Sequence, residues 1–197
     1  MKTVMQDLLR MWSIKVRNGY LTKYRDIDPF SIQYLPTREI QFRSNRKNCH
    51  RNRRGSLGKI MVGDWDQNCL SIEETYIHKW VYQRYHFGVN WEDSLYYEKH
   101  LNSGRFDQVA FRERCAYYDS LFESMKKHGY RTQRELNSKM RFVDALVNEI
   151  CVDIGRDGSY LLADSKHRLA MAKILGFEVV PACILVRHQE WVDGGKA

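Results

Sequence analysis

Hydrophobic and polar positions near the C-terminus follow the pattern of a β-hairpin. Residues 151–154 alternate with the period of two that a strand requires, and residues 160–163 can form the return strand. Asp157 and Gly158 lie between them, and this pair is a strong signal for a two-residue hairpin turn. The pattern therefore predicts a hairpin in this segment.

The spacing of apolar residues becomes helical directly after the hairpin. Asp164 or Ser165 can cap a helix there, and Gly176 is suited to end it in a left-handed conformation. The apolar positions of this helix are Leu169, Met171, Ala172, Ile174 and Leu175. A largely apolar strand follows over residues 179–186, and Pro181 predicts that it lies at a sheet edge or starts late.

The middle of the chain, residues 70–147, has the pattern of consecutive helices. We expect helices at about 71–85, 91–102 and 106–127, and Thr132 can start another. The longest of them carries an apolar stripe that favours core packing over ligand stacking. The stripe consists of Phe111, Tyr117, Tyr118, Leu121 and Phe122.

The N-terminal residues 1–16 are also spaced as an amphipathic helix. One face gathers Met5, Leu8, Leu9, Trp12 and Val16. We expect this face to pack against the rest of the protein, and binding to a membrane surface is the alternative.

Three consecutive basic residues, Lys166, His167 and Arg168, fall in the first turn of the helix that follows the hairpin. Backbone N–H groups at a helix start have no partner within the helix, and the helix dipole is positive there. Cations at this end weaken the helix unless an anion lies nearby. The pattern therefore predicts a bound phosphate.

The C-terminal hairpin, helix and strand resemble the ParB/sulfiredoxin superfamily. The resemblance is carried by the order of these elements, by His-Arg-Leu-Ala at the start of the helix and by Leu-Gly-Phe-Glu-Val-Val-Pro after it. In that superfamily a Gly-x-His-Arg box holds nucleotide phosphates. His167 and Arg168 match the last two residues of the box, Lys166 takes its variable place, and Ser165 stands where the family usually has Gly. The resemblance covers about 40 residues and extends weakly to residues 32–40.

The resemblance implies an α+β fold, with a small mixed β-sheet of ParB/sulfiredoxin type and a large helical insertion. We expect a single domain in three regions. Residues 1–69 hold a helix, strands and a basic loop, residues 70–147 form the insertion, and residues 148–197 form the phosphate-box unit. The ligands that the resemblance implies are a nucleoside di- or triphosphate (ATP, ADP or CTP) and Mg²⁺. Residues 164–168 would hold the nucleotide, and Asp164 could also position a metal or substrate.

An acidic pair, Asp64 and Asp66, follows the strand-like segment 59–62. Carboxylates at the end of a strand can hold Mg²⁺ or act as a general base, so this pair is our first candidate for the catalytic acid and for the metal site. Glu39 is the second candidate for a catalytic role. The alternative is structural, because Asp in such a position often forms a turn or caps a helix.

The segment from Arg43 to Lys59 is strongly basic, with seven Lys or Arg residues, His50 and no acid. A run of like charges can contact nucleic-acid phosphates, a nucleotide or a phosphorylated substrate. A solvated loop is an equally good interpretation. The formal charge of +8 favours anionic partners but does not select one.

Five cysteines are widely spaced, odd in number and without a Cys-x-x-Cys pair. This pattern argues against a disulfide framework or a zinc site and fits reduced thiols in the cytoplasm. Cys151 and Cys183 lie in expected strands, so we expect them in the core. We expect no membrane span, because no stretch approaches 18 apolar residues.

These observations lead to two functional hypotheses. The first is a cytoplasmic, nucleotide-binding enzyme similar to the small-molecule kinases of the superfamily, which transfers a phosphoryl group to a small hydroxyl acceptor with Mg²⁺. The second is a DNA-binding or nuclease protein of the ParB-like branch that uses Arg43–Lys59. A third possibility is a scaffold in which the box no longer binds a nucleotide.

Overall fold

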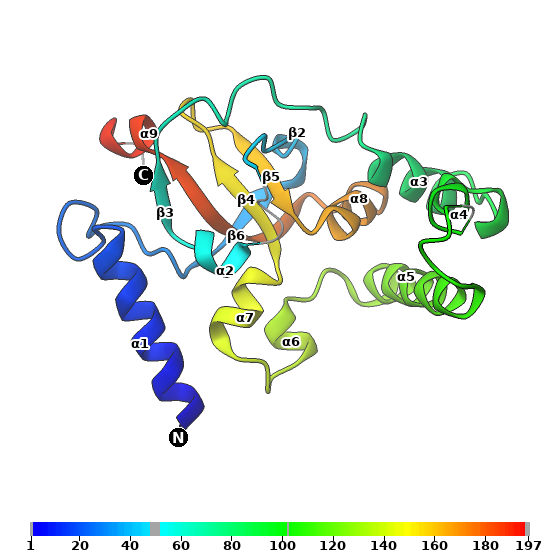
Figure 1. Cartoon of the computed structure of the whole chain (residues 1–197), viewed down its shortest axis with the longest axis horizontal. Coiled ribbons are helices and arrows are strands. Elements are labelled where there is room, and N and C mark those ends of the chain that lie inside the picture. Colours follow the sequence, from blue (N-terminus) through cyan, green and yellow to red (C-terminus); the bar gives the residue numbers. More distant parts are fainter. Residues whose placement is uncertain (1, 48–51, 102, 196–197) are drawn as a thin grey trace. The chain divides into compact units, whose positions relative to one another are not determined.

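The structure, a computed structural model, describes residues 2–47, 52–101 and 103–195, without the side chains of Lys2 and Thr3 (Figure 1). The chain falls into two compact units. The first unit contains the residues up to Ile72, Thr132–Ser165 and the residues from Glu178 onward. The second unit contains Glu73–Arg131 and Lys166–Phe177.

The first unit is a β-sheet with short helices around it. Its helices are α1 (Lys2–Arg17), η1 (Thr37–Glu39), α2 (Arg53–Ser56), α6 (Gln133–Leu136), α7 (Phe142–Val147) and α9 (Gln189–Asp193). Its strands are β1 (Ile32–Pro36), β2 (Phe42–Arg43), β3 (Lys59–Met61), β4 (Ile150–Ile154), β5 (Tyr160–Asp164) and β6 (Val179–His188).

The described strands form one mixed sheet in the order β1-β6-β4-β5-β2, and β3 pairs with β6 outside this path. Strand β6 runs antiparallel to β1 and parallel to β3 and β4. Strand β5 runs antiparallel to β4 and parallel to β2. The mixed α+β class predicted from the sequence is therefore confirmed, while the ParB/sulfiredoxin type stays a prediction.

The strand directions give the sheet two distinct ends. Strands β1 and β5 finish and β4 and β6 begin at one end, which we call the box end because Ser165 follows β5 there. The loop between β4 and β5 and the end of β3 lie at the other end, the hairpin end. Since β5 has five residues, the two ends are about 13 Å apart along it.

Strand β6 lies between β1 and β4, so the expectation of an edge strand is wrong for most of its length. It holds for Pro181 itself. Pairing with β4 starts only at Ala182, so Pro181 has a neighbour on one side, Tyr34 of β1. A proline is tolerated at such a position because its missing N–H group leaves no ladder bond unmade.

The connection between β4 and β5 spans residues 155–159, as the predicted strands 151–154 and 160–163 require. Its turn is centred one residue earlier than the predicted Asp157 and Gly158, because the backbone N–H of Gly158 donates to the carbonyl of Gly155. The backbone N–H of Arg156 in this turn also donates to the carboxylate of Asp66 at 2.8 Å.

The core of the first unit lies on β4 and β6, as their continuous apolar sequences require. Cys151 and Cys183 are fully buried and face each other across these parallel strands, which confirms their predicted core positions. Helix α7 packs on β6 and contributes Val143, Leu146 and Val147 to the same cluster.

The second unit is helical, with α3 (Tyr76–Tyr85), η2 (Trp91–Asp93), α4 (Leu95–His100), α5 (Gln108–His128) and α8 (Lys166–Ile174). Helix α3 begins later than predicted because Thr75, not Ser71, caps it. The stripe on α5 buries Phe111, Tyr118 and Phe122 as predicted, whereas Tyr117 stays exposed.

Helix α1 is present as predicted, but its predicted packing face is wrong. Met5, Leu8 and Trp12 are exposed, and the helix instead buries Asp7 and Ile14 against the first unit. The helix is apolar on two adjacent stripes, and periodicity alone does not tell which one meets the core. None of the helices in the described ranges is both long and apolar enough to cross a membrane.

Candidate functional site

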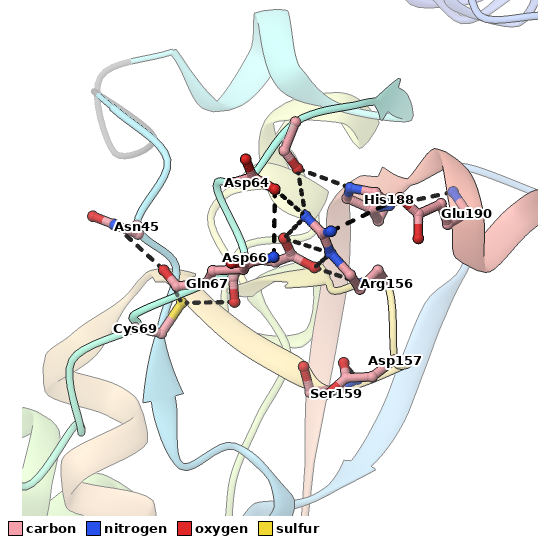
Figure 2. Close-up of polar contacts among 11 residues, drawn as sticks. Asn45, Asp64, Asp66, Gln67, Cys69, Arg156, Asp157, Ser159, His188 and Glu190 are labelled. Atoms are coloured by element: carbon pink, nitrogen blue, oxygen red, sulfur yellow. Dashed lines mark hydrogen bonds and ion pairs between the residues drawn. The ribbon is translucent and has the colours of Figure 1, made fainter.

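The acidic pair Asp64 and Asp66 lies at the hairpin end of the sheet, where both carboxylates bind Arg156 (Figure 2). The Arg156 guanidinium donates to Asp66 at 3.0 Å from both Nε and Nη2, and to Asp64 at 2.8 Å. It also reaches the carbonyl of Gly63 at 2.9 Å, to which His188 comes equally close. The pair is thus part of a cluster that joins β3 to the hairpin loop.

The two carboxylates differ in burial and share one cation. The Asp66 side chain is 3% exposed and that of Asp64 is 79% exposed. Burial raises the pKa of Asp66, but the hydrogen bonds from Arg156 outweigh it and hold that pKa below its usual value. An oxygen that accepts from a guanidinium is a poor ligand for Mg²⁺, so the cluster does not fit the metal that the resemblance implies.

The structure does not bring the acidic pair together with Asp164 and Ser165. Asp164 ends β5 and Ser165 follows it at the box end, about 13 Å away along the strand. Glu39, the other candidate acid, follows β1 at the box end and is exposed. In the described residues no group of three or more His, Cys, Asp or Glu side chains is arranged to hold a metal ion.

Ser165 has a left-handed backbone, with φ of 66°. Only glycine adopts this conformation without cost, and the related box usually has glycine here. The Ser165 hydroxyl donates to the carbonyl of Glu149 at 2.6 Å, which ties the end of β5 to the start of β4. The glycine-type geometry of the box is therefore kept by a serine.

The basic segment Arg43–Lys59 is held by acids of the first unit. Arg46 forms two hydrogen bonds of 3.1 Å with the fully buried Asp153. Arg53 lies 3.3 Å from Asp164. In the same way Arg54 pairs with Asp144. Within the described part of this segment, three arginines thus serve ion pairs, which neither sequence hypothesis included; His50 and Arg51 lie outside the described residues.

The three basic residues at the start of α8 point in different directions, as successive residues of a helix must. His167 enters an aromatic cluster of the second unit, where its ring lies 4.7 Å from that of Tyr118 and 5.5 Å from that of Trp80. The Arg168 guanidinium lies over the ring of Tyr130 at 5.7 Å. Lys166 is half-buried.

His167 is neutral at pH 7. Burial, and after it the nearby charges of Arg114 and Lys166, lower its pKa to about 4. Its Nε2 lies 3.2 Å from the hydroxyl of Tyr118, so the ring is oriented by a hydrogen bond. Three cations at this helix start were expected to bind one phosphate. The central one, His167, is therefore uncharged at pH 7.

A pocket of about 230 Å³ opens beside His167, entirely within the second unit. Aromatic residues from α3, α4 and α5 form much of its wall, and three cations lie around it. The described lining contains no carboxylate. It consists of Tyr76, Ile77, Trp80, Tyr96, Lys99, His100, Arg105, Phe106, Arg114, Tyr118 and His167.

The lining is arranged with rings inside and charges outside. Trp80 and Tyr96 are buried, whereas Lys99, Arg105 and Arg114 are exposed and so stand at the pocket mouth. Lys99 already lies 3.9 Å from the centre of the Tyr76 ring. The mouth is therefore positively charged and the interior is apolar, which suits a ligand with one aromatic and one anionic end.

Two residues of the pocket wall carry a buried nitrogen without a hydrogen-bond partner among the described residues. They are Nε1 of Trp80 and Nδ1 of His100. Burial, followed by the charges of Arg105 and Lys99, also lowers the pKa of His100. A buried N–H without a partner costs free energy in the absence of a ligand or water, so these atoms favour a polar occupant.

Of the pocket residues, His167 was predicted from the sequence as a binding residue and Tyr118 as a core residue. The others are spread over residues 76–118, and nothing in their spacing brings them together before α3, α4 and α5 pack. A usable signal was present in the composition of this stretch, where Arg and Lys alternate with Tyr, Trp and Phe.

Comparisons with protein-family models, with curated proteins and with solved structures gave no significant match. Membership of the ParB/sulfiredoxin superfamily therefore stays a prediction from the sequence.

Proposed function

We propose that this protein binds a small ligand that joins an aromatic ring to a phosphate, and that this ligand is a nucleotide. The observation that carries the proposal is the pocket of the second unit, with five aromatic residues and three cations and no carboxylate in its described lining. The ParB/sulfiredoxin resemblance implies the same class of ligand through His167, which is part of the pocket wall.

The base would lie against Tyr76 and Phe106, the lining rings that are only half-buried, because Trp80, Tyr96 and Tyr118 are 0–3% exposed. Stacking on aromatic side chains contributes about 1–3 kcal/mol per base and accepts any base. The phosphate meets Lys99, Arg105 and Arg114 at the mouth. The pocket is below the usual range for drug-sized ligands, about 300–1,000 Å³, so a single nucleotide suits it better than a larger cofactor.

The proposal is limited to binding. Phosphoryl transfer needs a free carboxylate for Mg²⁺ or for the acceptor hydroxyl, and Arg156 binds both Asp64 and Asp66. The nucleic-acid hypothesis is weakened as well, because Arg46, Arg53 and Arg54 pair with acids of their own unit.

Isothermal titration calorimetry with AMP, ADP, ATP and CTP tests this proposal. We expect at least one nucleotide to bind, and adenosine or inorganic phosphate alone to bind more weakly. Arg114→Met should weaken binding about tenfold or more, because it removes a charged partner of the phosphate. Arg112→Met is the matched control, since Arg112 is exposed on the same helix but does not line the pocket.

Two results would contradict the proposal. One is the absence of heat and of a thermal shift with every nucleotide at millimolar concentration. The other is equal binding by the Arg112→Met and Arg114→Met variants together with unchanged binding by Lys99→Met. Circular dichroism spectra of the variants establish that each is folded.

A further inference from the structure

Helix α1 is fixed to the first unit along one side. The Arg141 guanidinium donates to Asp7 at 2.7 and 3.1 Å, and the backbone N–H of Phe142 donates to the other oxygen of the same carboxylate at 3.2 Å. Ile14 is buried and Met11 packs against the core cluster. The helix is therefore held in place by its Asp7–Met11–Ile14 side.

A second stripe of α1 lies next to that side and has no cover in the described structure. Six large apolar side chains on it are 48–65% exposed. They are Val4, Met5, Leu8, Leu9, Trp12 and Val16, and we call them the outer stripe. Soluble proteins rarely expose so many large apolar side chains on one face unless that face binds something.

The shape of the outer stripe favours a flat partner. At 100° per residue its members spread over about 140° of the helix circumference. A partner helix would instead meet a narrow seam of two positions in seven. Trp12 lies near the middle of this broad face, and tryptophan is enriched where protein meets the lipid headgroup region.

The charge of α1 selects an anionic partner. The helix sequence contains four cations, Lys2, Arg10, Lys15 and Arg17, and a single acid, Asp7. The Asp7 carboxylate is bound by Arg141, and Lys15 lies 3.9 Å from Asp28, so the excess positive charge lies on the other three cations. A second copy of the chain, with a formal charge of +8, would bring like charges together at the same contact. A surface of anionic lipids would instead attract this helix.

We propose that the outer stripe of α1 docks on the surface of an anionic phospholipid membrane. The helix lies in the plane of the interface, with the outer stripe in the headgroup and upper acyl region and Arg10 and Arg17 on the opposite face. Binding is reversible, because the helix lies in the interface and does not span the membrane. This site is independent of the nucleotide pocket.

Vesicle flotation with the full chain tests the proposal. We expect the protein to float with vesicles of phosphatidylcholine and phosphatidylglycerol at 7:3, to float less with phosphatidylcholine alone, and to be released by salt. The double variant Leu8→Gln/Leu9→Gln should lower binding at least tenfold. The matched control is Leu70→Gln/Leu136→Gln, which changes two leucines of similar exposure outside α1 and should bind like the parent.

The proposal is overturned if the parent protein does not float with anionic vesicles, or if the Leu8→Gln/Leu9→Gln variant floats as well as the parent. Light scattering after gel filtration distinguishes the other occupant. A dimer that the same variant dissociates, without vesicle binding by the parent, assigns the outer stripe to self-association.

Discussion

The backbone strain at the junction between β5 and α8 lies at Ser165. Its φ of 66° costs an L-residue about 1–2 kcal/mol, and such conformations persist where neighbouring contacts determine them. The bond from its hydroxyl to the carbonyl of Glu149 is one such contact. The side chain that strains the backbone thus also helps to hold it.

Two substitutions separate these effects. Ser165→Ala keeps the strain and loses the hydrogen bond, so it should lower the free energy of unfolding by about 1 kcal/mol. Ser165→Gly loses the hydrogen bond but removes the strain. Its free energy of unfolding should therefore lie within about 0.5 kcal/mol of that of the parent protein. Urea denaturation followed by circular dichroism measures both. If the Ser165→Ala variant is more stable than the Ser165→Gly variant, the left-handed conformation does not determine the free energy of unfolding.

His167 makes stability depend on pH. Its pKa of about 4 in the folded protein lies below the value of about 6.5 in the unfolded chain, because burial disfavours the imidazolium. Below pH 6.5 the unfolded state therefore binds a proton that the folded state does not, and stability falls as the pH falls toward 4. The size of this effect is up to about 3 kcal/mol, from 1.36 kcal/mol per pKa unit.

The variant His167→Gln should lose less stability than the parent between pH 7 and pH 4.5, by about 2 kcal/mol. Other groups, including His100, titrate in both proteins and cancel in the comparison. His128→Gln is the control, because His128 is exposed at the end of α5 and should leave the pH profile unchanged. Identical profiles for His167→Gln and the parent would show that His167 titrates normally.

At the scale of elements, the ion pair between Arg46 and Asp153 attaches the basic segment to β4. The Asp153 side chain is fully buried and also accepts a hydrogen bond of 2.7 Å from Ser44. Breaking a buried pair leaves an uncompensated charge, which costs more than the pair itself contributes.

Arg46→Met should therefore lower the free energy of unfolding by about 3–5 kcal/mol. Lys47→Met, which removes the same charge from an exposed neighbour, should change it by less than about 0.5 kcal/mol. Thermal and urea denaturation of both variants provide the comparison. Equal stability would mean that the segment is a solvated loop, one of the two interpretations of its sequence.

Elements with strong local signals could be predicted from the sequence, and elements shaped by distant contacts could not. The hairpin strands, α8 and the glycine after it followed from alternation, helical spacing and Gly176, which has a φ of 72° as expected. The contact between Arg156 in the hairpin loop and Asp66, 90 positions away, has no local signal. The burial of α1 depended on Arg141, which no periodicity in residues 1–16 reveals.

In the candidate site, too, residues with a local sequence signal could be predicted and their distant contacts could not. The box residues His167 and Arg168 could be identified because they are adjacent in the chain, but their directions follow from Trp80, Tyr118 and Tyr130 of other helices. Likewise Asp64 and Asp66 were recognisable as an acidic pair, whereas their partner Arg156 lies in a loop whose residue types resemble an ordinary turn.

At the scale of the whole molecule, the two units differ in what they contribute. In the first unit Arg46, Arg156 and Arg141 are each bound to a carboxylate. The second unit gathers Lys99, Arg105 and Arg114 around a pocket whose described lining has no acid. We therefore propose the second unit as the nucleotide-binding part, although the net charge of +8 is spread over both units.

This assignment predicts where a nucleotide protects the backbone. A ligand at 100 times its dissociation constant stabilises the state that binds it by about 2.7 kcal/mol. Amide hydrogen exchange should consequently slow in α3, α4, α5 and α8 on addition of the tightest nucleotide found by calorimetry, and the amides of β1, β4 and β6 should exchange as before. Because the second unit combines Glu73–Arg131 with Lys166–Phe177, slowing in both segments would also show that they open together. Protection confined to the sheet would place the nucleotide in the first unit and contradict the pocket. For the Arg114→Met variant, tenfold weaker binding leaves the same nucleotide at about ten times its dissociation constant, so the stabilisation should fall to about 1.4 kcal/mol and exchange should slow less.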